Sequence, residues 1–530
     1  MRSLILALAL FQISESIEVH VAEVDVVVVD GAGKPVSGLT KADFELRVDG
    51  RVRDISNFYA AEGDRSPVTG DGAATPPSSV TSHPSPVTSS PSPVPPTHVV
   101  VFVDEERLDL RERNRVLASL GKFVESHLRP GVDVAVIVFN HGLKTRLQPT
   151  RDSAKLHAII DEISRETPRL NETLSERRRI MQMIDDAVVE NGRRGGLLSP
   201  DVIKQRMFVY GEHQITDLRQ SLEAIELVMK RLRGATGRKV FVHVSSGLPL
   251  QPAVELYDYF ERRLHQSISL DKVGLQQMSA YQYLVGAAQA AGVALYTIDA
   301  SGLTGDEGSN LQTNSVDHLD SHLMRDNLHG PLQMLADETG GKAIINENDF
   351  DRAFGEIEAQ YTTYYSLGFR ADSDKATHKI DVRVKRPGLT VRSARAYRGR
   401  DADERARDGV EAQFDFPSNE NPLGVAIALG RIENGNVPVR VAVAPEKLIV
   451  LEKKAHVRCY FQMRNADGGT SPLRAVDEEI AVSDESAPVV LRPIGMKLRP
   501  GKYTLSMAVR DLVSNDTSFV TRAIEVPALR

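Results

Sequence analysis

A chain of 530 residues is long enough for about three folded units, so a single core is not expected. The formal net charge of −7, with no long run of like charge, argues against a nucleic-acid partner, because such proteins usually present a basic face. Cys459 is the only cysteine, which excludes an intrachain disulfide and any zinc site built from paired cysteines.

Residues 1–16 have the pattern of a secretory signal peptide. Arg2 supplies a positive charge, an apolar stretch runs from Leu4 to Phe11, and small or polar residues follow from Ser14. A frayed N-terminus or a buried first strand is the alternative. Neither this stretch nor any later one reaches the length of about 18 apolar residues that a transmembrane helix needs. We therefore predict an extracytoplasmic protein, periplasmic or secreted, without a transmembrane segment.

Residues 17–61 are predicted to form a small antiparallel β domain. It begins with the valine-rich strand IEVHVAEVDVVVVD, turns at DGAGKP, and continues with two short strands around Asp49 and Gly50. Residues 62–97 then change to proline, serine, threonine and glycine, a composition that cannot bury enough apolar surface to become ordered. We interpret this second stretch as a linker between two domains.

Strands and helices alternate across residues 98–372. Continuous apolar strands are predicted at THVVVFVDEE, VDVAVIVFN, KVFVHVSSGL and GVALYTIDASGL, and KAIINENDFDRAFGEIEAQYTTYYSLGFR closes the region with a strand, a helix and a strand. Repeated βα units predict an α/β fold with a doubly wound, mostly parallel sheet that has helices on both faces. Two insertions, residues 168–215 and 302–329, are expected at the edge where the strands end.

The rest of the chain returns to β patterns. Residues 373–421 are predicted as a hairpin and a polar connector, and residues 422–530 as a C-terminal β-sandwich domain. Short alternating segments such as VPVRVAVAP, AHVRCYFQMRN and KYTLSMAVRD recur there with turn residues between them. This spacing favours a sandwich of the immunoglobulin-like kind.

Between Val99 and Phe369 the order of these segments resembles the von Willebrand factor A (VWA) domain, and the whole chain resembles the bacterial VWFA-related proteins. The strings that carry the resemblance are VVVFVDEERLD, DVAVIVFN, GRKVFVHVSSG, GVALYTIDA and LADETGGKAI, preceded by VDVVVVDGAGKPVSGLTKADFELRVDG. The resemblance implies a VWA-type domain that binds another protein at the edge where the sheet strands end.

The resemblance also implies a metal-ion-dependent adhesion site, which combines a DxSxS loop with a distant threonine and a distant aspartate around a hard cation such as Mg²⁺. Asp104 matches the first aspartate, but Glu106 and Leu108 stand at the serine positions, and leucine has no ligand atom. Thr216 is only a loose match for the threonine. We expect a degraded site and no cofactor; any weak Mg²⁺ remnant would use Asp104, Glu106 and Thr216. The alternative is that Asp104 only orients the loop before the first helix.

Direct protein binding would then use side chains at this edge. The candidates are the acids Glu105, Glu106 and Asp109 of the first loop, and Ser245 and Ser246 after a later strand. Loops on a rigid scaffold can vary without unfolding it, so binding groups tend to gather there. The alternative is that the acids only complement the N-terminus of the helix that follows.

The sequence leaves two alternative functions. The run DHLDSHLMRDNLHG places His318 and His322 one helical turn apart, as zinc ligands can lie, which would suit a metal-dependent hydrolase. No GxSxG motif surrounds Ser245, so a serine nucleophile has no sequence support. The other function is that of a structural envelope component. We favour an exported, non-catalytic protein-binding module, whose partner, pathway and oligomeric state the sequence does not name.

Overall fold

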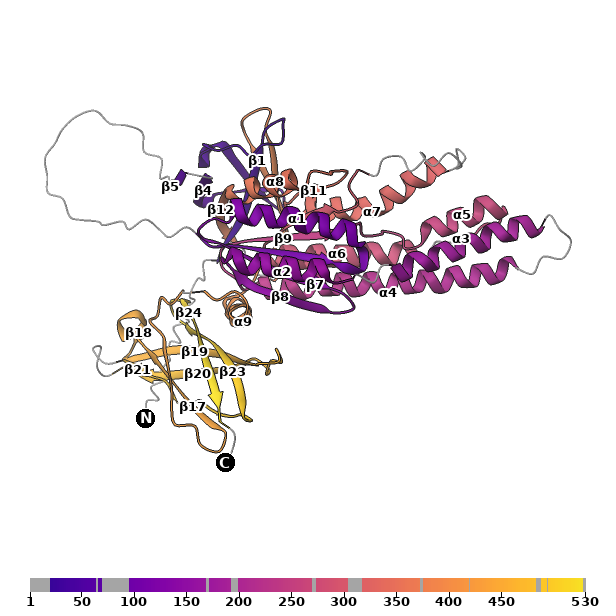
Figure 1. Cartoon of the computed structure of the whole chain (residues 1–530). Helices are drawn as coiled ribbons and strands as arrows, with labels where there is room; N and C mark the ends of the chain where they lie inside the picture. The colour runs from indigo at the N-terminus through magenta and orange to yellow at the C-terminus, as the bar shows by residue number, and fades with distance from the viewer. Residues whose placement is uncertain are drawn as a thin grey trace, which may run out of the picture.

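The computed structural model describes residues 20–62, 65–68, 95–167, 171–191, 199–268, 273–303, 317–371, 375–418, 420–482, 488–492 and 494–527. Over these residues the chain is a mixed α/β protein with five sheets and nine α-helices. Figure 1 shows a central α/β unit, with an N-terminal β sandwich beside it and a C-terminal β unit below it. The predicted signal peptide, residues 1–16, lies outside the described residues.

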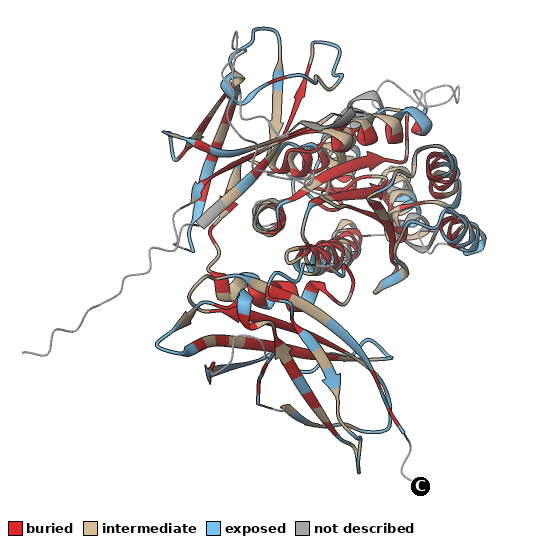
Figure 2. Ribbon diagram, turned by 90° about the vertical axis from the view of Figure 1, so that its left-hand side faces the viewer, coloured by how far each residue is buried: buried red, intermediate tan, exposed pale blue. Residues whose placement is uncertain are grey.

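The central unit is built on a six-stranded sheet with the order β11-β10-β9-β6-β7-β8. Its parallel strands are β6 (Thr97–Asp104), β7 (Val132–Phe139), β9 (Arg238–Ser245), β10 (Val293–Asp299) and β11 (Ala343–Ile344), and β8 (Leu143–Thr150) runs antiparallel to β7. The long parallel strands are buried almost throughout, as the red segments of Figure 2 show. Continuous apolar runs fold this way because both faces of the sheet are covered.

Helices cover both faces of this sheet. One face packs on α1 (Leu110–His127), α2 (Ser153–Arg165) and α8 (Phe350–Thr362), and the other on α4 (Pro200–Leu232), α6 (Val273–Ala291) and α7 (Asp317–Thr339). The sequence pattern places a polar loop at 302–329, but α7 already begins at Asp317. The polar residues in the first half of α7 obscure the apolar periodicity that would indicate a helix. Leu332 and Leu335 anchor α7 in the core. None of the described helices has the length and apolarity needed to cross a membrane.

A helical arm leaves the central unit at the end where β9 finishes. The arm consists of α3 (Asn171–Asn191), the first half of α4 (residues 200–216) and α5 (Val254–Leu264). These helices share an apolar core of their own, with Ile184, Met207 and Phe260 at its centre. Figure 1 shows the arm extending well beyond the sheet. The insertion expected at residues 168–215 is therefore two of the three helices of this arm.

The N-terminal sandwich is formed by two segments of the chain, one that precedes the central unit and one that follows it. Its sheets have the orders β14-β1-β12-β4-β5 and β15-β13-β2-β3. The strands are β1 (His20–Val29), β2 (Phe44–Val48), β3 (Arg51–Arg53), β4 (Ile55–Glu62), β5 (Arg65–Val68), β12 (Thr363–Ala371), β13 (Thr377–Val384), β14 (Thr390–Ser393) and β15 (Ala396–Arg398). Val26 and Leu46 from the first part of the chain share one core with Leu367 and Ile380 from the later part.

Two segments lie elsewhere than their patterns suggest. The sequence assigns YYSLGFR to the α/β sheet, but β12 pairs with β1 and β4 in the sandwich, because an apolar strand pattern does not specify its partner. Tyr365, Leu367 and Phe369 fill the sandwich core instead. Residues 65–68, inside the predicted linker, form β5 against β4. Most of that linker lies outside the described residues.

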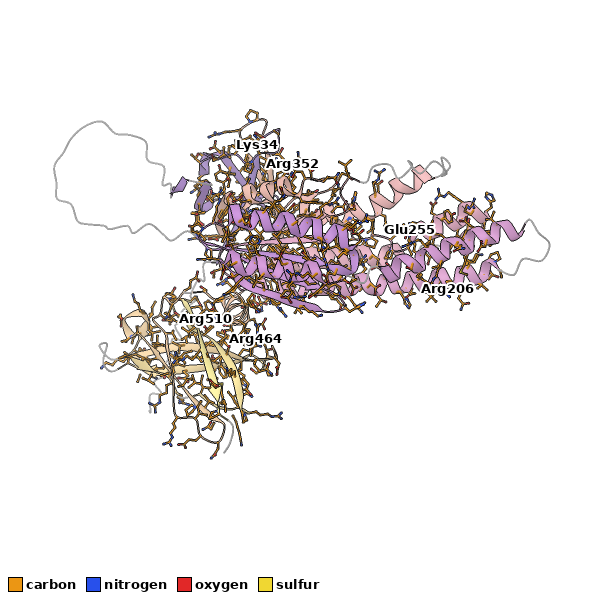
Figure 3. The ribbon with its side chains drawn as sticks, viewed as in Figure 1. Lys34, Arg206, Glu255, Arg352, Arg464 and Arg510 are labelled. Carbon is orange, nitrogen blue, oxygen red and sulfur yellow. The ribbon has the colours of Figure 1, made fainter. Side chains whose placement is uncertain are left out.

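The C-terminal unit is a second sandwich, preceded by α9 (Ala402–Ala412). Its strands are β16 (Ala426–Leu429), β17 (Asn436–Val443), β18 (Val450–Leu451), β19 (Lys454–Asn465), β20 (Arg474–Ala481), β21 (Val489–Val490), β22 (Ile494–Lys497), β23 (Gly501–Asp511) and β24 (Thr517–Val526). The helix α9 packs on Tyr460 and Ala508 of this sandwich. Figure 3 places Arg464 and Arg510 on the same unit, where they pair with Asp415 and Asp403.

Candidate functional site

Three neighbouring parallel strands end together at one edge of the central sheet. Val103 of β6 is in register with Val244 of β9, and Asp299 of β10 with Ser245 of β9. Because parallel strands run in the same direction, Asp104, Ser245 and Asp299 come to lie along one edge. We call it the carboxyl edge. It is the usual ligand edge of an open α/β sheet, and the helical arm starts from it.

The carboxylate of Asp104 is buried at this edge, not exposed on a loop. Its Oδ2 accepts a hydrogen bond of 2.6 Å from the hydroxyl of Ser221 on α4, and lies 3.7 Å from Nε of Arg107. Its Oδ1 has no hydrogen-bond partner among the described residues. The hydrogen bond from Ser221 connects the end of β6 to α4, which covers the sheet. Asp104 therefore orients the first loop from within the core.

His243 extends this buried cluster and was not singled out from the sequence. Its Nε2 lies 3.9 Å from Asp104 Oδ2, and its Nδ1 lies 3.4 Å from Ser245 Oγ. The order serine, histidine, aspartate resembles a hydrolytic triad, but both distances exceed the usual range of about 2.6–3.2 Å for an activated nucleophile. All three side chains are at most 1% exposed. A substrate therefore has no access to Ser245, and the cluster supports the loops above it.

Glu105 is buried as well, which corrects the hypothesis that it is an exposed binding residue. Its Oε1 accepts from Nη1 of Arg113 at 2.6 Å, and its Oε2 accepts from Nδ2 of Asn140 at 3.1 Å. Glu105 is 2% exposed, and the side chain of Arg113 is fully buried. The hypothesis is wrong because α1 carries a buried arginine that needs a carboxylate, so the side chain of Glu105 turns inward although it lies between a strand and a helix.

The other two acids of the first loop are only partly buried. Oε1 of Glu106 lies 2.8 Å from Nδ1 of His141 in the neighbouring loop, and it also accepts from the backbone N–H of His141. Burial raises the pKa of Glu106 above its usual value. Asp109 begins α1 as its N-cap: it accepts from the backbone N–H of Glu112 at 2.7 Å, and Glu112 accepts from the N–H of Asp109. Asp109 thus has the capping role that was the alternative interpretation.

The serines after β9 also have partners within the molecule. Ser245 is fully buried, so it cannot be part of a binding surface. Ser246 is half-buried and donates to Oε2 of Glu112 at 2.7 Å, which ties the second loop to the cap of α1. Thr216 is not in a loop: it lies on the exposed side of α4 and donates to the carbonyl of Glu212 at 2.9 Å. It does not join Asp104, whose hydroxyl partner is Ser221.

Asp299 at the end of β10 is a second buried carboxylate that the sequence analysis missed. Its Oδ1 accepts from the hydroxyl of Ser301 at 2.6 Å, and its Oδ2 lies 2.9 Å from Nε2 of His329 on α7. The available signal was a polar residue at the end of an apolar strand, in LYTIDAS and likewise in VFVHVSS. His329 of the histidine-rich run therefore has a structural partner. The side chains of His318 and His322 lie outside the described residues.

The edge does not assemble a set of metal ligands from the side chains that the structure describes. No group of three or more histidine, cysteine, aspartate or glutamate side chains in the described ranges is arranged to hold a metal ion. Leu108 is completely buried in the core below the loop. A hard cation would need several oxygen ligands that converge, and Asp104 instead faces Ser221, Arg107 and His243.

The arm presents three exposed apolar side chains on one helix. Val202, Phe208 and Val209 on the first half of α4 are 52%, 59% and 47% exposed. The opposite side of the same helix places Ile203, Met207 and Tyr210 in the core of the arm. Figure 3 shows Arg206 and Glu255, both on the arm, beyond the end of the sheet. The arm is thus a folded projection whose outer side carries three exposed apolar side chains among exposed polar ones such as Gln205 and Arg206.

Comparisons with known proteins find similarity only among solved structures. No protein-family model matches the sequence, and no curated protein matches it. An aerotolerance-related membrane protein from Bacteroides fragilis is 12% identical, with 50% of this chain and 98% of that chain covered and a TM-score of 0.25. The conserved hypothetical protein BatB from Bacteroides thetaiotaomicron is 12% identical, with 50% and 100% covered and a TM-score of 0.22. The vWF domain of the type V pili tip protein Mfa5 from Porphyromonas gingivalis is 22% identical over 13% of this chain and 26% of that chain, with a TM-score of 0.12.

Proposed function

We propose that this chain is an exported, non-catalytic protein-binding protein. In this proposal the central unit is a VWA-type domain with a degraded metal site, and its carboxyl edge together with the helical arm contacts a partner protein. The support for the architecture is the strand order of the sheet and the helices on both of its faces. The support for export is the apolar pattern near the N-terminus, from Leu4 to Phe11.

The observation that carries the proposal is the set of three exposed apolar side chains on the outer side of the arm. Val202, Phe208 and Val209 expose about half of their side chains within two turns of one helix. Contiguous exposed apolar side chains that are rimmed by polar ones mark interaction surfaces, because their burial in a complex removes apolar area from water. The neighbouring Arg206 and Lys204 supply such a rim.

The loops support the arm and contribute less to recognition than expected. Glu105 and Ser245 are buried, and Asp109 caps α1, so three of the five predicted binding residues serve the scaffold. Glu106 and Ser246 are partly buried and keep some exposed surface at the carboxyl edge. The proposed contact surface is therefore the outer side of α4, with Glu106 and Ser246 at its margin.

The non-catalytic part of the proposal rests on the same packing. The serine, histidine and aspartate that lie in a row at the carboxyl edge are closed off from solvent. A reaction at Ser245 would first require α4 and the first loop to move apart, which would break the Ser221–Asp104 hydrogen bond. A binding function requires no such movement.

The test is partner recovery with a variant of the arm. The full-length chain is cross-linked in its native compartment, once as wild type and once as the double variant Phe208→Ser with Val209→Ser. We expect the double variant to lose most of the recovered partner while its melting temperature stays unchanged, because both side chains are already solvated. The matched control is Val490→Ser, an apolar residue that is 58% exposed on the C-terminal sandwich. Equal recovery with wild type, control and double variant would refute the arm as the binding surface.

A further inference from the structure

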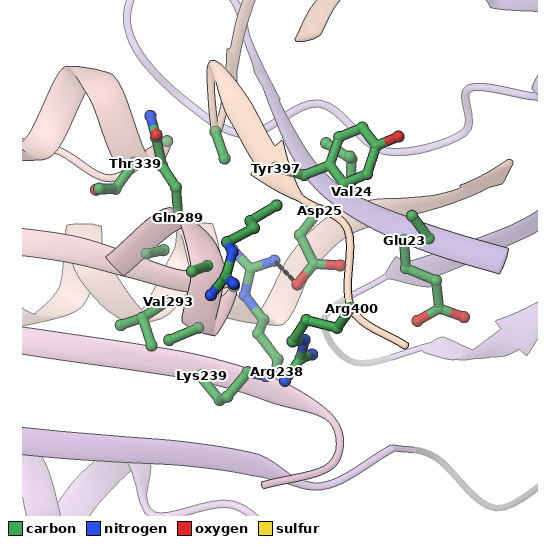
Figure 4. A pocket seen from close by; sticks show the side chains of 18 of the residues that line it. Glu23, Val24, Asp25, Arg238, Lys239, Gln289, Val293, Thr339, Tyr397 and Arg400 are labelled. Atoms are coloured by element: carbon green, nitrogen blue, oxygen red, sulfur yellow. Dashed lines mark ion pairs between the residues drawn. The ribbon is translucent and has the colours of Figure 1, made fainter. Parts of the chain in front are cut away.

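A pocket of about 530 Å³ lies at the amino end of the central sheet, opposite the carboxyl edge. Its charged lining comes mainly from β1 with Glu23 and Asp25, from the start of β9 with Arg238 and Lys239, and from the segment before α9 with Arg400. The end of α6 and the start of β10 line it as well, through residues 289–294. Figure 4 shows these side chains around the opening. The pocket is therefore formed by both the central unit and the N-terminal sandwich, together with the connection to the C-terminal sandwich.

Four arginines line this pocket, and all four have protein partners. Arg398 lies 3.6 Å from Oε1 of Glu404, and Arg405 donates to the carbonyl of Arg400 at 2.9 Å. Nη1 of Arg238 lies 3.2 Å from Oδ2 of Asp25, the pair marked in Figure 4, and its guanidinium lies over the ring of Tyr364 at 4.0 Å. Arg400 donates to Oδ2 of Asp408 at 3.1 Å and to a backbone carbonyl. Arg238 and Arg400 thus each have a carboxylate partner, so neither needs a ligand for charge compensation.

Lys239 differs from both arginines. Its Nζ donates to the backbone carbonyl of Ala235 at 3.2 Å, and no carboxylate of the described residues lies within salt-bridge distance of it. An ammonium group has three hydrogen-bond donors, so two remain available toward the pocket. Burial lowers the pKa of Lys239 to about 8, and the nearby charge of Arg400 adds to this effect. The charges of Asp25, Glu23 and Asp408 offset this effect only in part, because none of these carboxylates pairs directly with Lys239. The folded chain therefore keeps a cation without a directly paired carboxylate where desolvation opposes its charge.

We propose that this pocket binds a small anion, a carboxylate or a phosphate group, with Lys239 as its principal contact. An anion would use the free donors of the ammonium group and supply the missing counter-charge, which is worth more in a partly desolvated pocket than in water. Asp25 is paired with Arg238, and the charges of Asp25 and Glu23 act on Lys239 without a direct ion pair. A small anion at Lys239 thus meets fewer of these carboxylates than an extended polyanion would.

The binding test uses the full-length chain with inorganic phosphate and with acetate as separate probes, against sodium chloride of equal ionic strength. We expect one of the probes to raise the melting temperature saturably and to give a binding isotherm by calorimetry. Lys239→Met should weaken the affinity at least tenfold. The matched control is Lys144→Met on β8, an exposed lysine that does not line the pocket. A response to phosphate alone, or to acetate alone, identifies the anion class.

A second measurement needs no variant and no change of fold. Acetylation of individual lysines in the wild-type chain, followed by mass spectrometry, should slow several-fold at Lys239 when the bound anion is saturating, while Lys144 reacts at an unchanged rate. Absence of any saturable response to both probes would overturn the proposal. Equal affinity in Lys239→Met and wild type, or an unchanged rate of acetylation at Lys239, would overturn it too.

Discussion

Glu105 and Arg113 form a buried ion pair beneath the first loop of the carboxyl edge, with Oε1 and Nη1 2.6 Å apart. The pair connects the end of β6 to the first turns of α1, and Asn140 adds a hydrogen bond from the neighbouring strand end. Because both charges are withdrawn from water, each depends on the other for compensation. The pair is therefore part of the scaffold that positions Glu106 and Asp109.

Removing the carboxylate of Glu105 should destabilise the fold strongly. In Glu105→Gln the guanidinium of Arg113 stays buried without a counter-ion, and we expect a loss of about 3–5 kcal/mol in the free energy of unfolding, measured with urea. The control is Glu162→Gln, which breaks another arginine–glutamate pair of 2.6 Å whose glutamate is largely exposed. An exposed pair contributes about 0–1 kcal/mol. Similar losses in the two variants would contradict the buried position of Glu105.

The capping role of Asp109 leads to a second prediction. Asp109→Ala removes the side-chain acceptor for the N–H of Glu112, so we expect a loss of about 0.5–2 kcal/mol in the free energy of unfolding. Asp109→Asn keeps an acceptor oxygen in the same place and should retain most of the stability. Thermal and urea unfolding of both variants provide the measurement. If alanine and asparagine destabilise equally, Asp109 does not act as a cap.

The third prediction concerns the dependence of stability on pH. The pKa of Lys239 is about 8 in the folded chain, against about 10.4 in an unfolded one, so the unfolded chain holds more protons between these values. The stability that Lys239 contributes should therefore rise from pH 8 toward pH 10.4, and fall as the pH is lowered through 8. In a buffer free of phosphate and carboxylates, the stability of wild type relative to Lys239→Met should increase over this window. A difference that is independent of pH would disprove the lowered pKa.

The fourth prediction tests how the C-terminal sandwich is attached. A Cβ at Gly234, just after α4, would lie 1.9 Å from the carbonyl oxygen of Asp408 on α9. Gly234→Ala should therefore push α9 away, weaken the pairing of Asp408 with Arg233 and Arg400, and cost about 1–3 kcal/mol. Limited proteolysis should show faster cleavage around α9.

The control for this variant is Gly286→Ala on α6, where a new methyl group would meet no atom within 4 Å. This change should leave cleavage unaffected and, through helix propensity, raise stability by up to about 1 kcal/mol. If α9 is cleaved no faster in Gly234→Ala than in the control, the contact between Gly234 and Asp408 does not hold the sandwich in place.

The central strands could be predicted because a strand buried on both faces appears in the sequence as an apolar run, as from Val99 to Val103. The strand β8 was missed because LKTRLQPT is polar and lies at the sheet border, where only one side is covered. The first half of α4 was missed because its apolar residues pack on α3 and α5, not on the sheet. Apolar residues that pack within an insertion do not follow the periodicity expected of a helix that packs on the sheet.

The candidate site was predicted in position but not in orientation. Asp104 and Ser245 lie at strand ends, as their place after apolar runs indicates. Glu105 turns inward because it pairs with Arg113, which lies eight positions later on the helix. A local sequence pattern does not show which acid of the loop pairs with this arginine. Buried polar contacts of this kind are set by tertiary packing, so they become visible only in the folded chain.

The pairing of β1 with β12 limits the order in which the sandwich can fold during synthesis. The strand β1 is synthesised long before its partners β12 and β14. The same separation holds next to it, where the hydroxyl of Tyr365 donates to the carbonyl of Val36, 329 positions away. Until then the valines of β1 and its unpaired edge are open to wrong partners. We expect β1 to reach its final pairing only after β12 has been made. A chaperone that shields nascent β strands should therefore matter more for this protein than for one built from consecutive domains.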